Sequence, residues 1–221
     1  MKKLEDYLYY EEEKPSIKIY CGDSQEIMPL IGWEAIEVII SDPPYGMDYQ
    51  SAWRTDKTKW KEKIHGDNEY PKWIFELKPS NAMFVWCRWD NLYEMPKPKS
   101  FIVWDKKCHS MGDLEHEFGR QWEALAFYPG ESHKFERRPV DLIRASKVSP
   151  DKLLHPNEKP SEVYYPILES HKGIVVDPFM GSGSTLEACK EVGRSAIGIE
   201  INPKYCEIAK RRLQNTQRMM L

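Results

Sequence analysis

Seven short runs of β-branched and apolar residues restrict the fold of this chain more than any other feature of its 221-residue sequence. Most of the runs are followed by a turn or a helix signal, and strands that alternate with helices predict a mostly parallel sheet with helices on both faces. No linker or repeat divides the chain, so we predict one domain over residues 1–221. The runs cover residues 16–21, 36–41, 82–86, 101–104, 124–128, 173–176 and 195–199.

Two of the intervening helices have recognisable ends. Ser24 is the expected N-cap of a short helix over residues 24–28, which Pro29 should end or bend. A longer helix should begin at Asn202-Pro203, where an N-cap is followed by a proline in the first turn. The apolar stripe of this second helix consists of Tyr205, Ile208, Ala209 and Leu213.

Composition and charge exclude several classes of protein. No apolar run reaches the roughly 18–20 residues that cross a bilayer, so we expect no membrane association. The N-terminal region leads into Glu11-Glu12-Glu13 and lacks the apolar core of a secretory signal, which favours a cytoplasmic protein. The net charge of −3 gives no overall basic bias, so any contact with nucleic acid must come from local patches.

The five cysteines indicate neither a disulfide framework nor a zinc ribbon, because their number is odd and no pair has the C-x-x-C spacing. Cys108, His109 and His116 come nearest to a set of metal ligands. A fourth ligand at a suitable spacing is missing from the sequence around them. We therefore predict no metal centre.

The run at 173–176 leads into a glycine-rich turn over residues 177–185 and then into a helix start. Glycines let the backbone approach a ligand closely, and a helix N-terminus favours polar or anionic groups. The turn lacks the lysine of a phosphate-binding P-loop, so we do not expect a nucleoside triphosphate. About 20 residues further on, Glu200 ends the next strand, where a carboxylate can accept hydrogen bonds from ribose hydroxyls. The loop and Glu200 together predict a site for a nucleoside cofactor.

The run at 36–41 ends at Asp42-Pro43-Pro44-Tyr45. The two prolines remove two N–H donors and fix two φ angles, which leaves a stiff loop rich in hydrogen-bond acceptors. A carboxylate and a backbone carbonyl can together accept both hydrogens of an exocyclic amino group, whose nitrogen is otherwise a poor nucleophile. Tyr45 offers a flat face to a base removed from its stack. The loop predicts catalysis by positioning and electrostatics, without a covalent intermediate.

In their order along the chain, these motifs resemble the permuted β group of DNA amino-methyltransferases, in which the catalytic motif precedes the cofactor motif. Residues 155–160 look like the family's cofactor-side motif, and Gly22-Asp23-Ser24 looks like its N-terminal acidic motif. The resemblance covers nearly the whole chain and implies S-adenosylmethionine as the cofactor. It implies that the catalytic residues are Asp42, Pro43, Pro44 and Tyr45. The cofactor-binding residues that it implies are Asp23, Lys159, Pro160, Asp177, Pro178, Phe179, Gly181, Ser182, Gly183, Ser184, Thr185 and Glu200.

The same resemblance implies a fold and a reaction. The fold is a Rossmann-like α/β sheet of seven strands, mostly parallel with one antiparallel strand near the edge. The reaction is methyl transfer to a flipped DNA base, and the Asp-Pro-Pro-Tyr form more often accompanies adenine N6 than cytosine N4 methylation. Cytosine N4 transfer stays open, as do an RNA or protein-glutamine methyltransferase and a catalytically silent DNA-binding module.

The region between the catalytic and the cofactor motifs is short for this family. Residues 130–154 are the candidate target-recognition insertion, and residues 46–66 form a second basic segment with Trp53 and Trp60 interleaved. The small recognition region suggests a homodimer, and a cognate restriction endonuclease is a further candidate partner. The cations that we expect to contact DNA are Arg54, Lys57, Lys59, Lys61, Lys134, Arg137 and Arg138.

Overall fold

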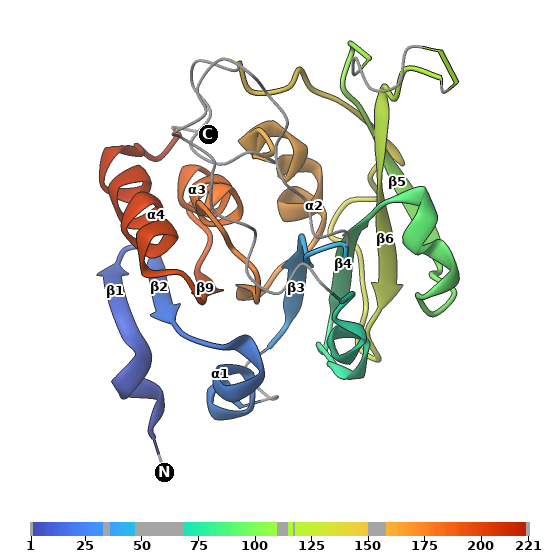
Figure 1. Ribbon diagram of the computed structural model, residues 1–221. Coiled ribbons are helices and arrows are strands. Elements are labelled where there is room, and N and C mark those ends of the chain that lie inside the picture. The colour runs from blue at the N-terminus through green and yellow to red at the C-terminus, as the bar shows by residue number, and fades with distance from the viewer. Residues whose placement is uncertain are drawn as a thin grey trace.

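A computed structural model of the chain describes residues 2–32, 36–46, 69–109, 115–116, 118–149 and 158–219. Within these residues a nine-stranded sheet runs through the molecule, with the order β1-β2-β9-β8-β3-β4-β6-β5-β7 (Figure 1). The strands are β1 (Leu8–Glu13), β2 (Ser16–Cys21), β3 (Val38–Ser41), β4 (Ala82–Cys87), β5 (Ser100–Asp105), β6 (Trp122–Pro129), β7 (Leu142–Arg144), β8 (Val175–Asp177) and β9 (Ala196–Glu200).

The inner strands of the sheet match the seven runs of the sequence. Six of these strands share one direction, and β6 opposes them between β4 and β5, as the predicted antiparallel strand near the edge. The predicted count of seven is wrong, because β1 and β7 add one strand to each edge. The second half of β1 is Glu11-Glu12-Glu13, which reads as an exposed charged segment, and β7 has only three residues.

Helices cover both faces of the sheet, as predicted (Figure 1). On one face lie α1 (Ser24–Ile31) and the 3-10 helix η3 (Lys72–Glu76), and on the other lie α2 (Tyr165–Ser170), α3 (Ser184–Glu191) and α4 (Pro203–Asn215). Three further 3-10 helices are η1 (Leu4–Tyr7), η4 (Trp89–Tyr93) and η5 (Ser161–Val163). Among the described residues, every helix is too short or too polar to cross a membrane.

Two helix starts test the predicted caps. Asn202 caps α4 as predicted, because its side chain accepts a backbone N–H of the first turn at 3.0 Å. At α1 the cap is Asp23 instead of Ser24, and its side chain accepts a backbone N–H at 2.8 Å. The same helix continues past Pro29 to Ile31, because one proline removes only one backbone hydrogen bond while buried side chains hold the helix on the sheet.

The carboxyl ends of the parallel strands bring distant segments together at one edge of the sheet. β3 lies between β8 and β4, with Val38 opposite both Val175 and Ala82. From β8 the chain moves to β9 on one side, and from β3 it moves to β4 on the other. Open α/β sheets bind their ligands at such a switch point. Asp42 follows β3 and Asp177 ends β8, so both carboxylates stand there.

Candidate active site

The loop from Asp42 to Tyr45 is held by hydrogen bonds at both ends. The Tyr45 hydroxyl donates to Oδ1 of Asp42 at 2.6 Å, and the side-chain amide of Asn91 in η4 donates to the Tyr45 carbonyl at 3.2 Å. Burial raises the pKa of Tyr45 well above its ordinary value, and the charge of Asp42 raises it further, so the phenol keeps its proton. The Asp42 carboxylate therefore has a fixed orientation, and its side chain remains 24% exposed for a substrate.

The second oxygen of Asp42 faces a buried cation. The ammonium of Lys159 donates to Oδ2 of Asp42 and lies 3.6 Å from Oε2 of Glu123 in β6. It also stands 4.8 Å from the ring centroid of Trp86 in β4. Burial lowers the pKa of Lys159, but the carboxylates of Asp42 and Glu123 outweigh it and hold the pKa above its ordinary value. Lys159 therefore stays charged beside the carboxylate of the loop.

Lys159 and Pro160 come from the segment before η5, to which the resemblance assigned a role toward the cofactor. The structure brings Lys159 to Asp42, so its ammonium donates a hydrogen bond to the loop at 42–45. Pro160 is buried and is the N-cap residue of η5. Residues 155–157, which belong to the same motif, lie outside the described residues. A role of either residue toward the cofactor stays a prediction.

The glycine loop begins at Asp177, a buried carboxylate at the end of β8. Its Oδ1 accepts the Phe179 N–H at 3.0 Å. Burial is the largest influence and raises the pKa of Asp177 to about 7, against the hydrogen bonds with Thr185 and the Phe179 amide, which lower it. Gly181 and Gly183 have φ angles of 52° and 81°, so the turn into α3 uses left-handed backbone that favours glycine.

Glu200 joins the glycine loop to the neighbouring strand. Its Oε2 accepts the Gly181 N–H at 3.1 Å. The N–H of Gly22 donates to the Glu200 carbonyl at 3.0 Å, which brings Asp23 to the same edge of the sheet. Asp23, Asp177 and Glu200 therefore follow or end three neighbouring strands, β2, β8 and β9, around the glycine loop.

The remaining predicted cofactor residues surround this loop. The hydroxyl of Ser24 donates to the carbonyl of Pro178, which ties the segment after β2 to the glycine loop. The ring of Phe179 packs on Trp73 of η3, with 5.7 Å between the ring centroids. The hydroxyl residues buried at the start of α3 are Ser182, Ser184 and Thr185.

The predicted DNA contacts fall into two groups. Those outside the described residues are Arg54, Lys57, Lys59 and Lys61, with the loop that holds them. Those that the structure describes are the exposed residues Lys134, Arg137 and Arg138. The second group follows β6, whose last residue, Pro129, pairs with Ala82 at the start of β4. The N–H of Gly130 donates to the Asn81 carbonyl at 2.7 Å, so this segment leaves the sheet at its amino edge, away from Asp42.

Sequence reasoning missed three side chains that either contact the loop at 42–45 or are linked to it through Lys159. Glu123 begins β6, and an antiparallel strand starts at the edge where its parallel neighbours end. A charge just before an apolar run was the available signal. Lys106 follows β5 and donates to Oε1 of Glu123 at 3.2 Å. Asn91 has no local signal, since only the tertiary fold brings η4 to the Tyr45 carbonyl.

Residues 36–211 match the profile of the N6/N4 DNA methylase family. YubD of Escherichia coli (strain K12), named as a methylase, is 29% identical over 224 residues, which cover 90% of this chain and 91% of YubD. The type II methyltransferase M.HpaI of Haemophilus parainfluenzae is 23% identical over 233 residues, which cover 90% of this chain and 74% of M.HpaI.

Solved structures share the fold. The complex of M1.HpyAVI with SAM has a TM-score of 0.65 at 22% identity, covering 89% of this chain and 99% of that one. The cytosine-N4-specific PvuII DNA methyltransferase has a TM-score of 0.61 at 14% identity, covering 92% and 94%. The family match extends from the strand before Asp42 into α4 and so includes both the catalytic and the glycine loop. The chain belongs to the N6/N4 DNA methylase family.

Proposed function

We propose that the protein methylates the N6 amino group of adenine in DNA, with S-adenosylmethionine as the methyl donor. One observation carries the proposal. Asp42 and the glycine loop follow neighbouring parallel strands, β3 and β8, and therefore meet at one switch point. An amino group held at Asp42 lies next to a donor held by the glycine loop.

The residues around the glycine loop suit a donor that is both a nucleoside and a cation. S-adenosylmethionine supplies a methyl group on a sulfonium, and it also carries ribose hydroxyls and an ammonium. We assign the ribose to Glu200 and the adenine amino group of the donor to Asp23. Because burial raises the pKa of Asp177 to about 7, a cationic ligand beside it favours its charged form. The three carboxylates thus fit the donor's chemistry.

Asp42 has the central part in the proposed reaction. Its carboxylate and a backbone carbonyl of the loop accept the two N–H groups of the adenine amino nitrogen and localise the lone pair on that nitrogen for attack. As the N–C bond forms and the S–C bond breaks, the amino nitrogen becomes positively charged and releases one proton, which Asp42 accepts and passes to water. Tyr45 keeps its hydrogen bond to Asp42 and stacks its ring on the flipped base.

Adenine is preferred to cytosine because of the aspartate that opens the loop. The Asp-Pro-Pro-Tyr form resembles the one that more often accompanies adenine in this family. Cytosine N4 is the alternative acceptor, since its amino group needs the same two hydrogen-bond acceptors. The PvuII enzyme, which has this fold, is cytosine-N4-specific.

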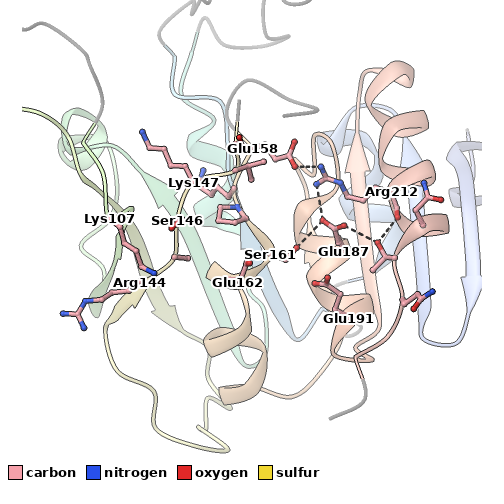
Figure 2. Close-up of a pocket in the computed structure, with 18 residues that line it drawn as sticks. Lys107, Arg144, Ser146, Lys147, Glu158, Ser161, Glu162, Glu187, Glu191 and Arg212 are labelled. Atoms are coloured by element: carbon pink, nitrogen blue, oxygen red, sulfur yellow. Dashed lines mark hydrogen bonds and ion pairs between the residues drawn. The ribbon is translucent and has the colours of Figure 1, made fainter. Parts of the chain in front are cut away.

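Three exposed cations lie at or just after the carboxyl ends of β5 and β7. Lys107 follows β5, Arg144 ends β7, and Lys147 comes three residues later. These three cations form one wall of a groove of about 1030 Å³ (Figure 2). The other wall holds Glu187 and Glu191 together with Arg212, which pairs with Glu158 and Glu187. A phosphate backbone at this edge meets the cationic wall and avoids the acidic one. We therefore propose these three as DNA contacts, together with the loop at 46–66.

A homodimer and a cognate restriction endonuclease are our proposals for partners, and we place the protein in the cytoplasm, where it meets DNA. The short segment available for target recognition supports the dimer, because a second subunit adds recognition surface. Light scattering at working concentrations checks the dimer, and a fully active monomer would remove it.

Product analysis tests the proposed function. The protein is incubated with S-adenosylmethionine and DNA of mixed sequence, and the DNA is digested to nucleosides for mass spectrometry. We expect N6-methyladenine. N4-methylcytosine would instead show that cytosine, the alternative acceptor, is the substrate. The absence of any methylated nucleoside from DNA, with tight binding of the donor, would instead support a silent binding module, and methylated RNA or glutamine would move the protein to another class of acceptor.

A further inference from the structure

Four side chains of alternating charge form a network at the catalytic edge of the sheet: Asp42, Lys159, Glu123 and Lys106. The ammonium of Lys159 contacts Asp42 and lies 3.6 Å from Glu123. The ammonium of Lys106 lies 3.2 Å from the second carboxylate oxygen of Glu123. The four residues come from the loop after β3, the segment before η5, the start of β6 and the end of β5. The charge network therefore links four segments that are distant in the sequence, and it does so through side-chain contacts.

The two lysines of this charge network are buried. Their side chains keep only 4% exposure at Lys159 and 6% at Lys106. The ring centroid of Trp86 lies 4.8 Å from the first ammonium, and that of Trp104 lies 6.0 Å from the second. An ammonium buried to this degree needs a carboxylate partner, because desolvation of a lone charge is costly. Both ammonium groups contact the carboxylate of Glu123, which therefore restricts where they can lie.

Glu123 is the carboxylate that the two lysines share. It stands opposite Trp104 in the register of β5 and β6, at the catalytic edge. Burial raises the pKa of Glu123, but the charges of Lys159, Lys106 and Lys147 lower it more, so the net pKa lies below its ordinary value. Glu123 is thus a charged group at neutral pH, held between two cations.

We propose that Glu123 is a positioning residue for methyl transfer, because it fixes the ammonium of Lys159 that in turn orients the carboxylate of Asp42. The inference rests on the proposed role of Asp42 as acceptor. Lys159 has a flexible four-carbon stem, and Glu123 is the second carboxylate that its ammonium contacts. Loss of that contact frees the ammonium to move, and a small misplacement of a group that aligns reactants lowers the rate more than it lowers binding.

The pKa of Lys159 depends on the same neighbouring charges. Among the described residues, its ammonium interacts with Asp42 from the loop after β3, Glu123 from β6 and Tyr164 from the cap of α2. Cys87 of β4 and Lys106 after β5 also interact with it. Burial raises the pKa of Tyr164 to about 12, so this phenol stays neutral at moderately alkaline pH. Asp42 and Glu123 hold the pKa of Lys159 above its ordinary value. Removal of the Glu123 charge therefore lowers the pKa of Lys159 and brings an alkaline loss of activity to lower pH.

Two substitutions separate charge from size at this position. Glu123→Gln keeps the size and removes the charge, whereas Glu123→Asp keeps the charge. The matched control is Glu12→Gln, which breaks the partly buried ion pair between Glu12 and Lys190, 2.8 Å apart. Glu12 lies in β1, the edge strand farthest from β5 and β7 in the sheet order. The measurements are kcat, the KM for DNA and the KM for the donor across neutral and alkaline pH, together with thermal unfolding.

We expect Glu123→Gln to lower kcat about tenfold or more, with both KM values within about twofold of wild type. Its alkaline limb should lie at lower pH than that of wild type. Glu123→Asp should recover part of the rate, and Glu12→Gln should leave kcat and the pH profile unchanged. Lys106→Met, which removes the other cation from Glu123, should lower kcat a few-fold and serves if the Gln variant does not fold. A Glu123→Gln variant with unchanged kcat, or with losses confined to KM, overturns the inference.

A second measurement needs no catalytic activity. The Lys159 side chain is followed by NMR in ligand-free protein with isotope-labelled lysine, and its alkaline midpoint is compared between wild type and Glu123→Gln. We expect the midpoint to fall in this variant and to stay in place in Glu12→Gln. An unchanged midpoint means that Glu123 does not hold Lys159 and overturns the inference. A wild-type protein that shows the expected midpoints but methylates no nucleic acid contradicts the proposed function instead.

Discussion

Asp42 and Asp177 end neighbouring strands of one sheet, yet their surroundings differ. Asp42 keeps 24% of its side chain exposed and contacts a buried ammonium on one oxygen and a phenol on the other. Asp177 is 2% exposed, and its described partners are a backbone N–H and the hydroxyl of Thr185. Burial accordingly raises the pKa of Asp177 to about 7, while the carboxylate of Asp42 faces a permanent cation.

The difference indicates a division of work between the two strand ends. A partly exposed carboxylate with fixed orientation suits an acceptor for a group that enters from solvent. A buried carboxylate inside a glycine turn suits a bound ligand that brings a positive charge. Under the proposed function, methyl transfer takes place at the end of β3, and the donor binds at the ends of β8 and β9.

The largest expected effect comes from Asp42→Ala. The substitution removes the acceptor for the amino group, and we expect kcat to fall by about a thousandfold or more. The Kd for S-adenosylmethionine, measured by calorimetry, should stay within a few-fold of wild type, because the glycine loop is untouched. A variant that retains near wild-type kcat contradicts the role of Asp42.

The next effect is a pH dependence of stability that belongs to Asp177. Its pKa is about 7 in the folded protein against 3.8 ordinarily, so the folded state binds the proton more tightly. The stability that this proton adds is complete below the ordinary pKa and is lost as pH rises through about 7. Asp177→Asn mimics the protonated form at every pH and should therefore lack this pH dependence.

Between about pH 5 and pH 8 we expect the stability of Asp177→Asn relative to wild type to increase by about 2–3 kcal/mol. Urea unfolding at the two pH values measures the difference. If the stability difference between the two proteins does not change with pH, Asp177 does not carry the raised pKa that the comparison requires.

A smaller effect should follow from Glu200→Gln. An amide in place of this carboxylate loses one of the two acceptors that hold the Gly181 and Asn202 amides, and it weakens the contact with ribose hydroxyls. We expect the Kd for the donor to rise about tenfold, with kcat at saturating donor within a few-fold of wild type. Unchanged affinity would remove Glu200 from the donor site.

The smallest effects concern DNA affinity and compare the two edges of the sheet. Neutralising the cations at the catalytic edge should weaken DNA binding a few-fold and reduce the salt slope by up to about 3, near one per cation. The same change at the amino edge should alter neither quantity. The first set is Lys107, Arg144 and Lys147, and the second set is Lys134, Arg137 and Arg138. Fluorescence anisotropy at several salt concentrations measures both, and a larger loss from the second set would reverse the proposed orientation of DNA.

Local patterns in the sequence were sufficient to predict the seven inner strands of the sheet and the positions of both loops, but not the edge strands β1 and β7. Asp42-Pro43-Pro44 and the glycine turn each follow a strand, so their positions at the carboxyl edge depend only on strand direction. The cap of α4 at Asn202 is equally local. Predictions that needed only neighbouring residues are therefore confirmed for these elements.

Side-chain positions that depend on long-range contacts could not be predicted from the sequence. Lys159 is separated from Asp42 by more than a hundred residues, and nothing in its local motif indicates that its ammonium reaches that carboxylate. Glu123 and Lys106 acquire their positions from the antiparallel pairing of β5 and β6. For the same reason the charge pattern around Lys134 predicted a DNA-contacting segment, whereas the direction of β6 brings that segment to the amino edge.

The central claim is that Asp42 directs a methyl group from a donor bound at the glycine loop onto an exocyclic amino group. A single-turnover experiment tests it most directly. The protein is loaded with one equivalent of S-adenosylmethionine carrying a deuterated methyl group, mixed with DNA and excess unlabelled donor, and the nucleosides are analysed by mass spectrometry. We predict deuterated N6-methyladenine with wild type and none with Asp42→Ala, although that variant holds the donor. Deuterated product from Asp42→Ala at the wild-type rate, or no labelled nucleoside from wild type, would contradict the claim.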